Sequence, residues 1–138
     1  MVKKLLFIDD DKVTQMVNRY VMEDEGFCDQ IIEAYNGKEA LLYFRTLNKD
    51  ADAINKLPEV ILLDLNMPMM DGWTFFEIFE KEFPQFIIKI KIFILSSSVN
   101  PKDKERAINE PNIVTMLEKP LDPDQLQIIN DALAKEKG

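Results

Sequence analysis

Histidine is absent from the 138-residue chain. Its absence removes the most common general base, the most common zinc ligand and any function as a phosphohistidine carrier. Glycine is scarce as well, and the 4 glycines are too scattered for a phosphate-binding loop, which argues against an ATPase or a kinase. Chemistry in this chain therefore depends on carboxylates, hydroxyls and lysines.

Cysteine and basic charge are also limited. Cys28 is the only cysteine, so an intramolecular disulfide is impossible and a reducing, cytoplasmic setting is expected. The net charge is −8 and there is no dense basic cluster, so we expect no nucleic-acid partner. The apolar stretch near the N-terminus is too short for a signal peptide and no run reaches transmembrane length, so we expect no membrane association.

Apolar segments rich in β-branched residues recur along the chain. Short runs without polar alternation are typical of strands that are buried on both faces of a parallel sheet. The sequence predicts five such strands, at Lys4–Ile8, Gln30–Glu33, Val60–Leu63, Ile90–Leu95 and Val114–Leu117.

Helical patterns separate the predicted strands. Apolar residues between Val13 and Val21 recur every three or four positions, which predicts an amphipathic helix that ends at Gly26. The other helices are expected to follow the capping residues Asn36, Asp71, Asn100 and Asp122. This alternation over residues 1–138 predicts a single α/β domain, with helices on both faces of a parallel sheet.

Polar residues follow several of the predicted strands. In an open parallel sheet, a binding site forms beyond the carboxyl ends of the strands. Asp9 and Asp10 follow the first strand, Asp64 the third and Ser96 the fourth, and Lys119 lies near the end of the fifth. Each has an ordinary structural explanation when taken alone, such as helix capping or strand termination. Together they predict one shared polar cluster.

Such a cluster needs a compensating cation. Carboxylates within a few ångströms repel one another by about 1–4 kcal/mol per pair. Oxygen ligands without histidine or cysteine select a hard ion such as Mg²⁺. Lys119 adds a second positive charge and Ser96 a neutral donor, so the cluster suits the three oxygens of a phosphoryl group. Asp64 is then the nucleophile that forms an acyl phosphate.

Four motifs in this order resemble the receiver domain of two-component response regulators. They are "LFIDDD" with Asp9 and Asp10, "VILLDLNMPMMDGW" with Asp64, "IFILSSS" with Ser96 and "LEKPL" with Lys119. The resemblance covers nearly the whole chain and indicates a stand-alone receiver without an output domain.

The resemblance implies both a fold and a metal site. The fold is a flavodoxin-like, or CheY-like, doubly wound five-stranded parallel sheet in the order 2-1-3-4-5. Asp10, Asp64 and the backbone carbonyl of Asn66 would bind Mg²⁺ directly, and Asp9 would act through water. Lys119 and Ser96 would hold the phosphoryl oxygens, and the bond from Lys119 to Pro120 would be cis.

The resemblance also implies partners. Asp64 would accept a phosphoryl group from a phosphohistidine on a histidine kinase or a histidine phosphotransfer protein. The chain would catalyse this transfer to itself and the later hydrolysis, without being an enzyme on other substrates. Output would come through contact with a downstream protein. The face built by the helix after Asn100, the fifth strand and the last helix serves the family for targets and homodimers.

The sequence departs from the family pattern at two places. Met116 stands where many receivers carry a Tyr or Phe that turns inward on phosphorylation, so the aromatic half of the usual switch is missing. Residues 45–57 form a longer connection than in many receivers, which is typical of a tolerated surface insertion, and partner selection there is a hypothesis. Asn66 and Ser98 stand where the family tunes the access of water to the acyl phosphate.

Other functions compete with this interpretation. A pseudo-receiver that binds partners without phosphorylation is one, although such proteins commonly lose an acid or the lysine. A phosphatase with an aspartyl nucleophile would need a second acid two residues after Asp64, where this chain has Asn66. A flavin-binding protein would need a hydroxyl- and glycine-rich loop after the first strand, where this chain has aspartates.

Overall fold

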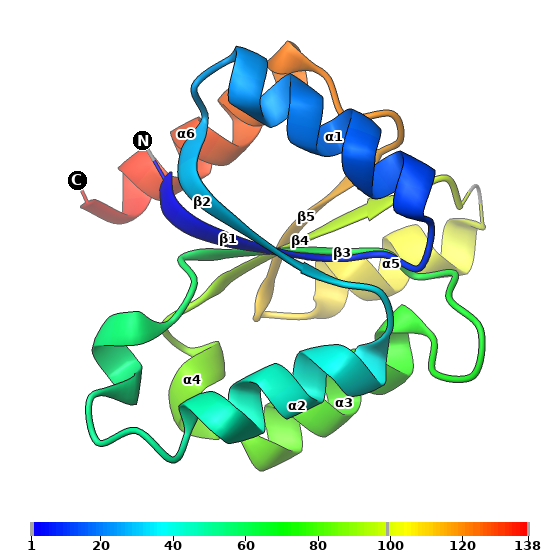
Figure 1. Cartoon of the computed structure of the whole chain (residues 1–138). Helices are drawn as coiled ribbons and strands as arrows, with labels where there is room; N and C mark the ends of the chain where they lie inside the picture. Colours follow the sequence, from blue (N-terminus) through cyan, green and yellow to red (C-terminus); the bar gives the residue numbers. More distant parts are fainter. Residues whose placement is uncertain (1, 99, 138) are drawn as a thin grey trace.

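A parallel five-stranded sheet lies between two layers of helices in the computed structural model of the chain (Figure 1). The structure describes residues 2–98 and 100–137. The sheet order is β2-β1-β3-β4-β5, as the resemblance implies. The strands are β1 (Val2–Ile8), β2 (Cys28–Ala34), β3 (Val60–Leu63), β4 (Lys91–Ser96) and β5 (Ile113–Glu118). All five predicted strands are confirmed, with ends that differ by at most two residues.

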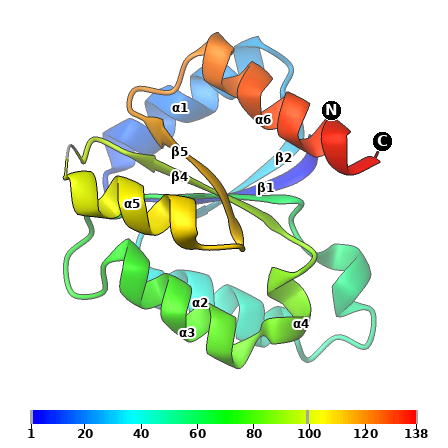
Figure 2. The same ribbon diagram turned by 180° about the vertical axis from the view of Figure 1, so that it is seen from behind.

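Helices cover both faces of the sheet (Figures 1 and 2). One layer holds α1 (Lys12–Asp24) and α6 (Pro123–Lys137). The other holds α2 (Gly37–Leu47), α3 (Gly72–Glu82), α4 (Pro84–Ile87) and α5 (Pro101–Asn109). A 3₁₀ turn, η1 (Ala53–Lys56), precedes β3. The sequence did not predict α4 and η1, because elements of 4 residues are too short to show a period.

Aromatic side chains dominate the core between the sheet and the second layer. The Phe44 and Phe79 ring centroids are 4.5 Å apart, and Phe83 stacks on Phe86 at 5.3 Å. All four of these rings are buried. The aromatic residues of α3 are core residues, except that Trp73 is only half-buried at the edge of this layer.

The orientation of α1 differs from what its apolar spacing suggests. The apolar residues that located the helix are largely exposed, namely Val13, Met16, Val17 and Tyr20. The opposite face is buried and includes Gln15, whose amide donates to the carbonyls of Phe7, Asp9 and Ala34 at 3.2, 3.1 and 3.0 Å. A buried amide is stable there because its NH2 group finds carbonyl acceptors at the ends of β1 and β2.

Capping residues begin the helices where the sequence places them. The Asn36 side chain accepts from the Glu39 amide, and Asp71 accepts from the Thr74 amide. The Asn100 side chain accepts a hydrogen bond from the Lys102 amide, and Pro101 directly follows this cap as the first residue of α5. Such caps satisfy amides that have no partner within the helix.

Residues 45–57 form a folded connection on the surface. Arg45 binds Glu82 of α3 through two contacts of 2.6 and 2.7 Å. Ala53 is buried in the aromatic core cluster, and Leu57 packs against the same cluster. The connection is thus anchored to the second helical layer at both ends.

Candidate functional site

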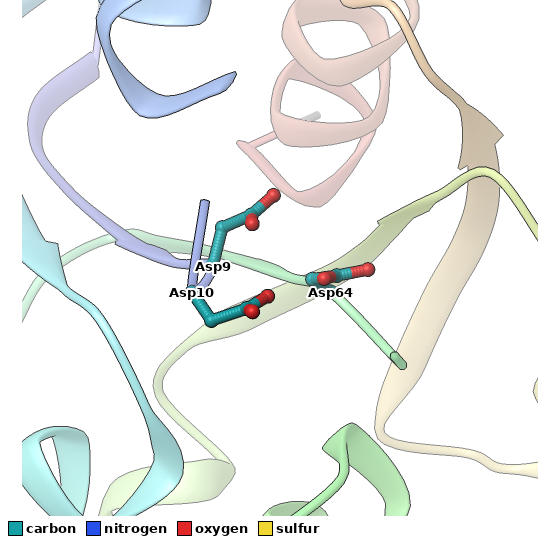
Figure 3. A group of neighbouring side chains, drawn as sticks. All are labelled: Asp9, Asp10 and Asp64. Atoms are coloured by element: carbon teal, nitrogen blue, oxygen red, sulfur yellow. The ribbon is translucent and has the colours of Figure 1, made fainter. Parts of the chain in front are cut away.

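Three aspartates meet where β1 and β3 end (Figure 3). Asp9 and Asp10 directly follow β1, and Asp64 directly follows β3. Carboxylate oxygens of all three lie within 4.8 Å of one another. The structure therefore brings the predicted acidic residues together at the carboxyl edge of the sheet.

Lys119 reaches this cluster from the end of β5. Its Nζ atom lies 2.6 Å from Oδ2 of Asp9 and 3.5 Å from Oδ1 of Asp64. The Lys119 amide donates to the Ser96 carbonyl at 3.1 Å, which joins the ends of β5 and β4. The peptide bond from Lys119 to Pro120 is cis, as the resemblance implies.

Burial makes the acidic cluster electrostatically demanding. Asp9 is fully buried and Asp64 is 3% exposed, whereas Asp10 is exposed to solvent. Burial raises the pKa of Asp64 to about 6; Lys119 opposes this shift and the Asp9 carboxylate adds to it. Three carboxylates facing one ammonium leave two formal negative charges, the amount that a divalent cation neutralises.

The donor set fits a hard cation. Each of the three aspartates offers a carboxylate oxygen, and the described residues near them include no histidine or cysteine ligand. Mg²⁺ prefers oxygen ligands and retains several waters, so an exposed carboxylate beside a buried one suits it. The residues present therefore fit the magnesium site that the sequence predicts.

Ser96 lies buried at the end of β4. Its Oγ atom accepts a hydrogen bond from the Ser98 amide at 3.1 Å. A serine hydroxyl has two acceptor lone pairs and one donor proton, so this bond leaves the proton available to another acceptor. Met116 lies half-buried on the neighbouring strand β5, paired in register with Ile94.

Backbone contacts hold the two aspartate segments in place. The Asn66 amide donates to Oδ1 of Asp64 at 3.3 Å, and the Asp11 amide donates to Oδ1 of Asp9 at 3.0 Å. Gly72 lies against the segment after β3, because a Cβ atom there would lie 2.4 Å from the Asp64 carbonyl oxygen. Only glycine allows this approach of α3 to the site.

Two further residues support the site. Gln15 holds the carbonyl of Asp9, and Asp11 caps α1 by accepting from the Val13 and Thr14 amides at 2.9 and 3.2 Å. No local signal marks Gln15, because a polar residue opposite the apolar stripe of α1 would ordinarily face solvent. Asp11 is a capping residue type directly before the helical pattern of α1, and this local signal could have located it.

Comparison with known families decides the classification. The model of the response regulator receiver domain matches residues 5–130. The chain belongs to this family. The receiver assignment, the CheY-like fold and the place of the chain among two-component response regulators, as predicted from the four motifs, are thereby confirmed.

Relatives and solved structures agree with this membership. The chain is 26% identical over 101 residues to the alkaline phosphatase synthesis transcriptional regulatory protein SphR of Synechococcus elongatus. It is 28% identical over 134 residues to the sensor histidine kinase CheAY of Helicobacter pylori. A two-component response regulator from Cytophaga hutchinsonii has a similar fold, with a TM-score of 0.89 at 24% identity over 97% of this receiver and 98% of that chain.

The matched region is a small part of the curated relatives. The match to SphR spans 73% of the receiver but only 37% of SphR. The match to CheAY spans 97% of the receiver but only 15% of CheAY. In the described part of the receiver, every helix is too short or too polar to cross a membrane.

Proposed function

We propose that Asp64 accepts a phosphoryl group from a phosphohistidine on a histidine kinase or a histidine phosphotransfer protein. The observation that carries this proposal is the pairing of a buried, nearly inaccessible Asp64 with Lys119 Nζ at 3.5 Å, inside a cluster of three carboxylates. A lone buried carboxylate would be a poor nucleophile, whereas one held beside a lysine and a metal-binding pair is suited to phosphoryl transfer.

Each residue has a defined task in this proposal. The Asp64 carboxylate attacks phosphorus, a P–O bond forms, and the P–N bond to the donor histidine breaks. Asp10, Asp64 and the backbone carbonyl of Asn66 would hold Mg²⁺ directly, and Asp9 would act through water. When bound, Mg²⁺ would supply positive charge that offsets the negative charge of the transferring group.

Lys119 and Ser96 complete the pocket around the phosphoryl group. Lys119 Nζ is already 2.6 Å from Asp9 and can place a charged hydrogen bond on a phosphoryl oxygen close to Asp64. The Ser96 hydroxyl donates to a second oxygen. The chain thus promotes phosphorylation and dephosphorylation of its own Asp64 and is not an enzyme on other substrates.

The downstream partner is a protein whose affinity for the receiver changes with phosphorylation. Both proteins would meet in the cytoplasm. The proposed contact face is the surface of α5, β5 and α6, and the proposal includes a homodimer that forms through the same face. This face contains a cavity of about 430 Å³. Its lining residues are Lys104, Ala107, Ile108, Val114, Thr115, Met116 and Glu118. Ile108 and Val114 are exposed there, which supports a protein contact.

A phosphorylation-independent interaction module is the second candidate. The exposed apolar stripe of α1 and the absence of an aromatic residue from β5 both suit a surface that acts without the usual switch. The complete set of three acids and one lysine favours phosphorylation instead.

Acetyl phosphate tests the proposal without a partner. The receiver is incubated with acetyl phosphate and Mg²⁺, and intact-mass spectrometry is expected to detect a gain of one phosphate that EDTA prevents. Asp64→Asn is expected to gain none, while Asp29→Asn, an exposed carboxylate on β2, gains it at the normal rate. A phosphate gain by Asp64→Asn would remove Asp64 from its proposed role.

A further inference from the structure

A chain of contacts leads from Ser96 to the surface between α3 and α5. The Ser98 amide donates to Ser96 Oγ at 3.1 Å, and the Ser98 hydroxyl donates to Oδ2 of Asp103 at 2.6 Å. The other oxygen of the same carboxylate, Oδ1, accepts from the Trp73 indole nitrogen at 3.0 Å. Asp103 therefore connects the loop after β4 with the first turn of α3.

Asp103 is well placed to hold this position. It lies in the first turn of α5, where a negative charge is stabilised by the helix dipole, and its amide donates to the Asn100 carbonyl at 3.1 Å. Both of its carboxylate oxygens are engaged, one by each neighbouring segment. Hydrogen bonds to a charged acceptor are stronger than those between neutral groups, so the two segments are firmly joined.

The Trp73 end of this chain is equally constrained. The Arg106 guanidinium lies 4.3 Å from the indole centroid, and its NH2 atom pairs with Oε1 of Glu77 at 2.6 Å. Trp73 directly follows Gly72, whose amide donates to the Leu65 carbonyl at 2.9 Å, next to Asp64. The contacts thus link the segments that follow β3 and β4, which carry the proposed nucleophile and the proposed hydroxyl donor.

Strand β5 has the sequence IVTMLE and therefore contains no aromatic residue that could couple the site to the surface. We propose that Asp103 is a positioning residue for the site: through Ser98 it orients the Ser96 hydroxyl, and through Trp73 it couples the loading of Asp64 to the α3–α5 surface. This inference rests on the proposed phosphoryl transfer to Asp64. The Ser98 amide occupies an acceptor lone pair of Ser96, which leaves the Ser96 proton free to be donated to a phosphoryl oxygen.

Trp73 is the only tryptophan, so its fluorescence reports directly on this connection. The full chain is loaded with acetyl phosphate and Mg²⁺ while tryptophan emission and phosphate gain by intact mass are followed together. In the unsubstituted protein, emission is expected to change in step with the mass gain. Ser98→Ala keeps Asp64, Lys119 and Ser96 but removes the hydroxyl that binds Asp103.

Ser98→Ala is expected to lower the initial phosphorylation rate about three- to tenfold, the effect of one lost hydrogen bond, and to abolish the emission change. Ser98→Thr, which keeps the hydroxyl, is expected to restore both. Asp103→Ala is expected to behave as Ser98→Ala does. Asp124→Ala removes an exposed acid from the first turn of α6 in the same way and is expected to leave both readouts unchanged.

The outcomes separate this inference from the proposed function. Absence of any mass gain in the unsubstituted protein would contradict phosphoryl transfer to Asp64. The role of Asp103 alone would be overturned by a different result: the unsubstituted protein gains phosphate, and Ser98→Ala and Asp103→Ala show the same phosphorylation rate and the same emission change as the unsubstituted protein. Thermal unfolding of each variant, followed by circular dichroism, confirms that the compared proteins are folded.

Discussion

Replacement of Asp64 by asparagine is expected to stabilise the metal-free receiver. Burial is the main reason that the pKa of Asp64 rises from 3.8 to about 6, and its side chain is only 4% exposed. At neutral pH the folded protein therefore carries a carboxylate that would be more stable in the unfolded chain. A shift of about two pKa units corresponds to about 3 kcal/mol of lost stability above pH 6.

The sign of the pH dependence follows from the direction of the shift. Between pH 4 and 6 the folded state holds a proton on Asp64 that the unfolded state has lost, so the contribution of Asp64 to the stability of the unsubstituted protein falls as pH rises through this window. Below this window both states are protonated and the penalty disappears. The amide introduced by Asp64→Asn carries no charge at any pH, so the advantage of this variant is expected at pH 7.5 and not at pH 3.5.

Thermal unfolding in EDTA measures this difference. We expect Asp64→Asn to gain about 1–3 kcal/mol at pH 7.5, or about 3–9 °C in Tm for a domain of this size. Millimolar Mg²⁺ is expected to narrow the gap, because a ligand of the folded state stabilises only the protein that binds it. Asp29→Asn, which removes an exposed carboxylate, is the control. A lower Tm for Asp64→Asn in EDTA, or a gap that does not depend on pH, would refute this reasoning.

Three further predictions concern packing and reactivity. Gly72→Ala is expected to lose about 1–3 kcal/mol in urea unfolding, because its Cβ would lie 2.4 Å from the Asp64 carbonyl oxygen; an unchanged midpoint would contradict that contact. Phe79→Ala, in the aromatic core, is expected to lose about 3–5 kcal/mol, whereas Val17→Ala on the exposed stripe of α1 changes stability by less than about 0.5 kcal/mol. Burial raises the pKa of the Cys28 thiol from 9.0 to about 11. Ellman's reagent at pH 8 is therefore expected to react about tenfold more slowly with the folded protein than with the urea-unfolded chain, because the loss of thiolate outweighs its greater nucleophilicity; equal rates would contradict this.

The fold was largely predictable because buried parallel strands leave a strong local signal. The run Val60–Leu63 is apolar throughout and is buried throughout. Caps such as Asn36 and Asp71 were visible as single residues because their side chains act within three positions of themselves. The acidic cluster was predictable because parallel strands end at the same edge of the sheet.

Other features depend on contacts that are distant in sequence. The buried face of α1 could not be chosen from its period, because Gln15 gains carbonyl partners on β1 and β2 that no local pattern reveals. The connection from Ser98 through Asp103 to Trp73 joins residues up to 30 positions apart. Such pairs become visible only when the helices are packed on the sheet.

The central claim is that Asp64 is the phosphorylated residue, and its most direct test is chemical mapping. The receiver is phosphorylated with acetyl phosphate and Mg²⁺, reduced with borohydride, which converts an aspartyl phosphate to homoserine, and digested for tandem mass spectrometry. Homoserine is expected at position 64, and none is expected in a sample prepared with EDTA. Homoserine at Asp9 or Asp10 instead, or at no position despite a phosphate gain, would contradict it.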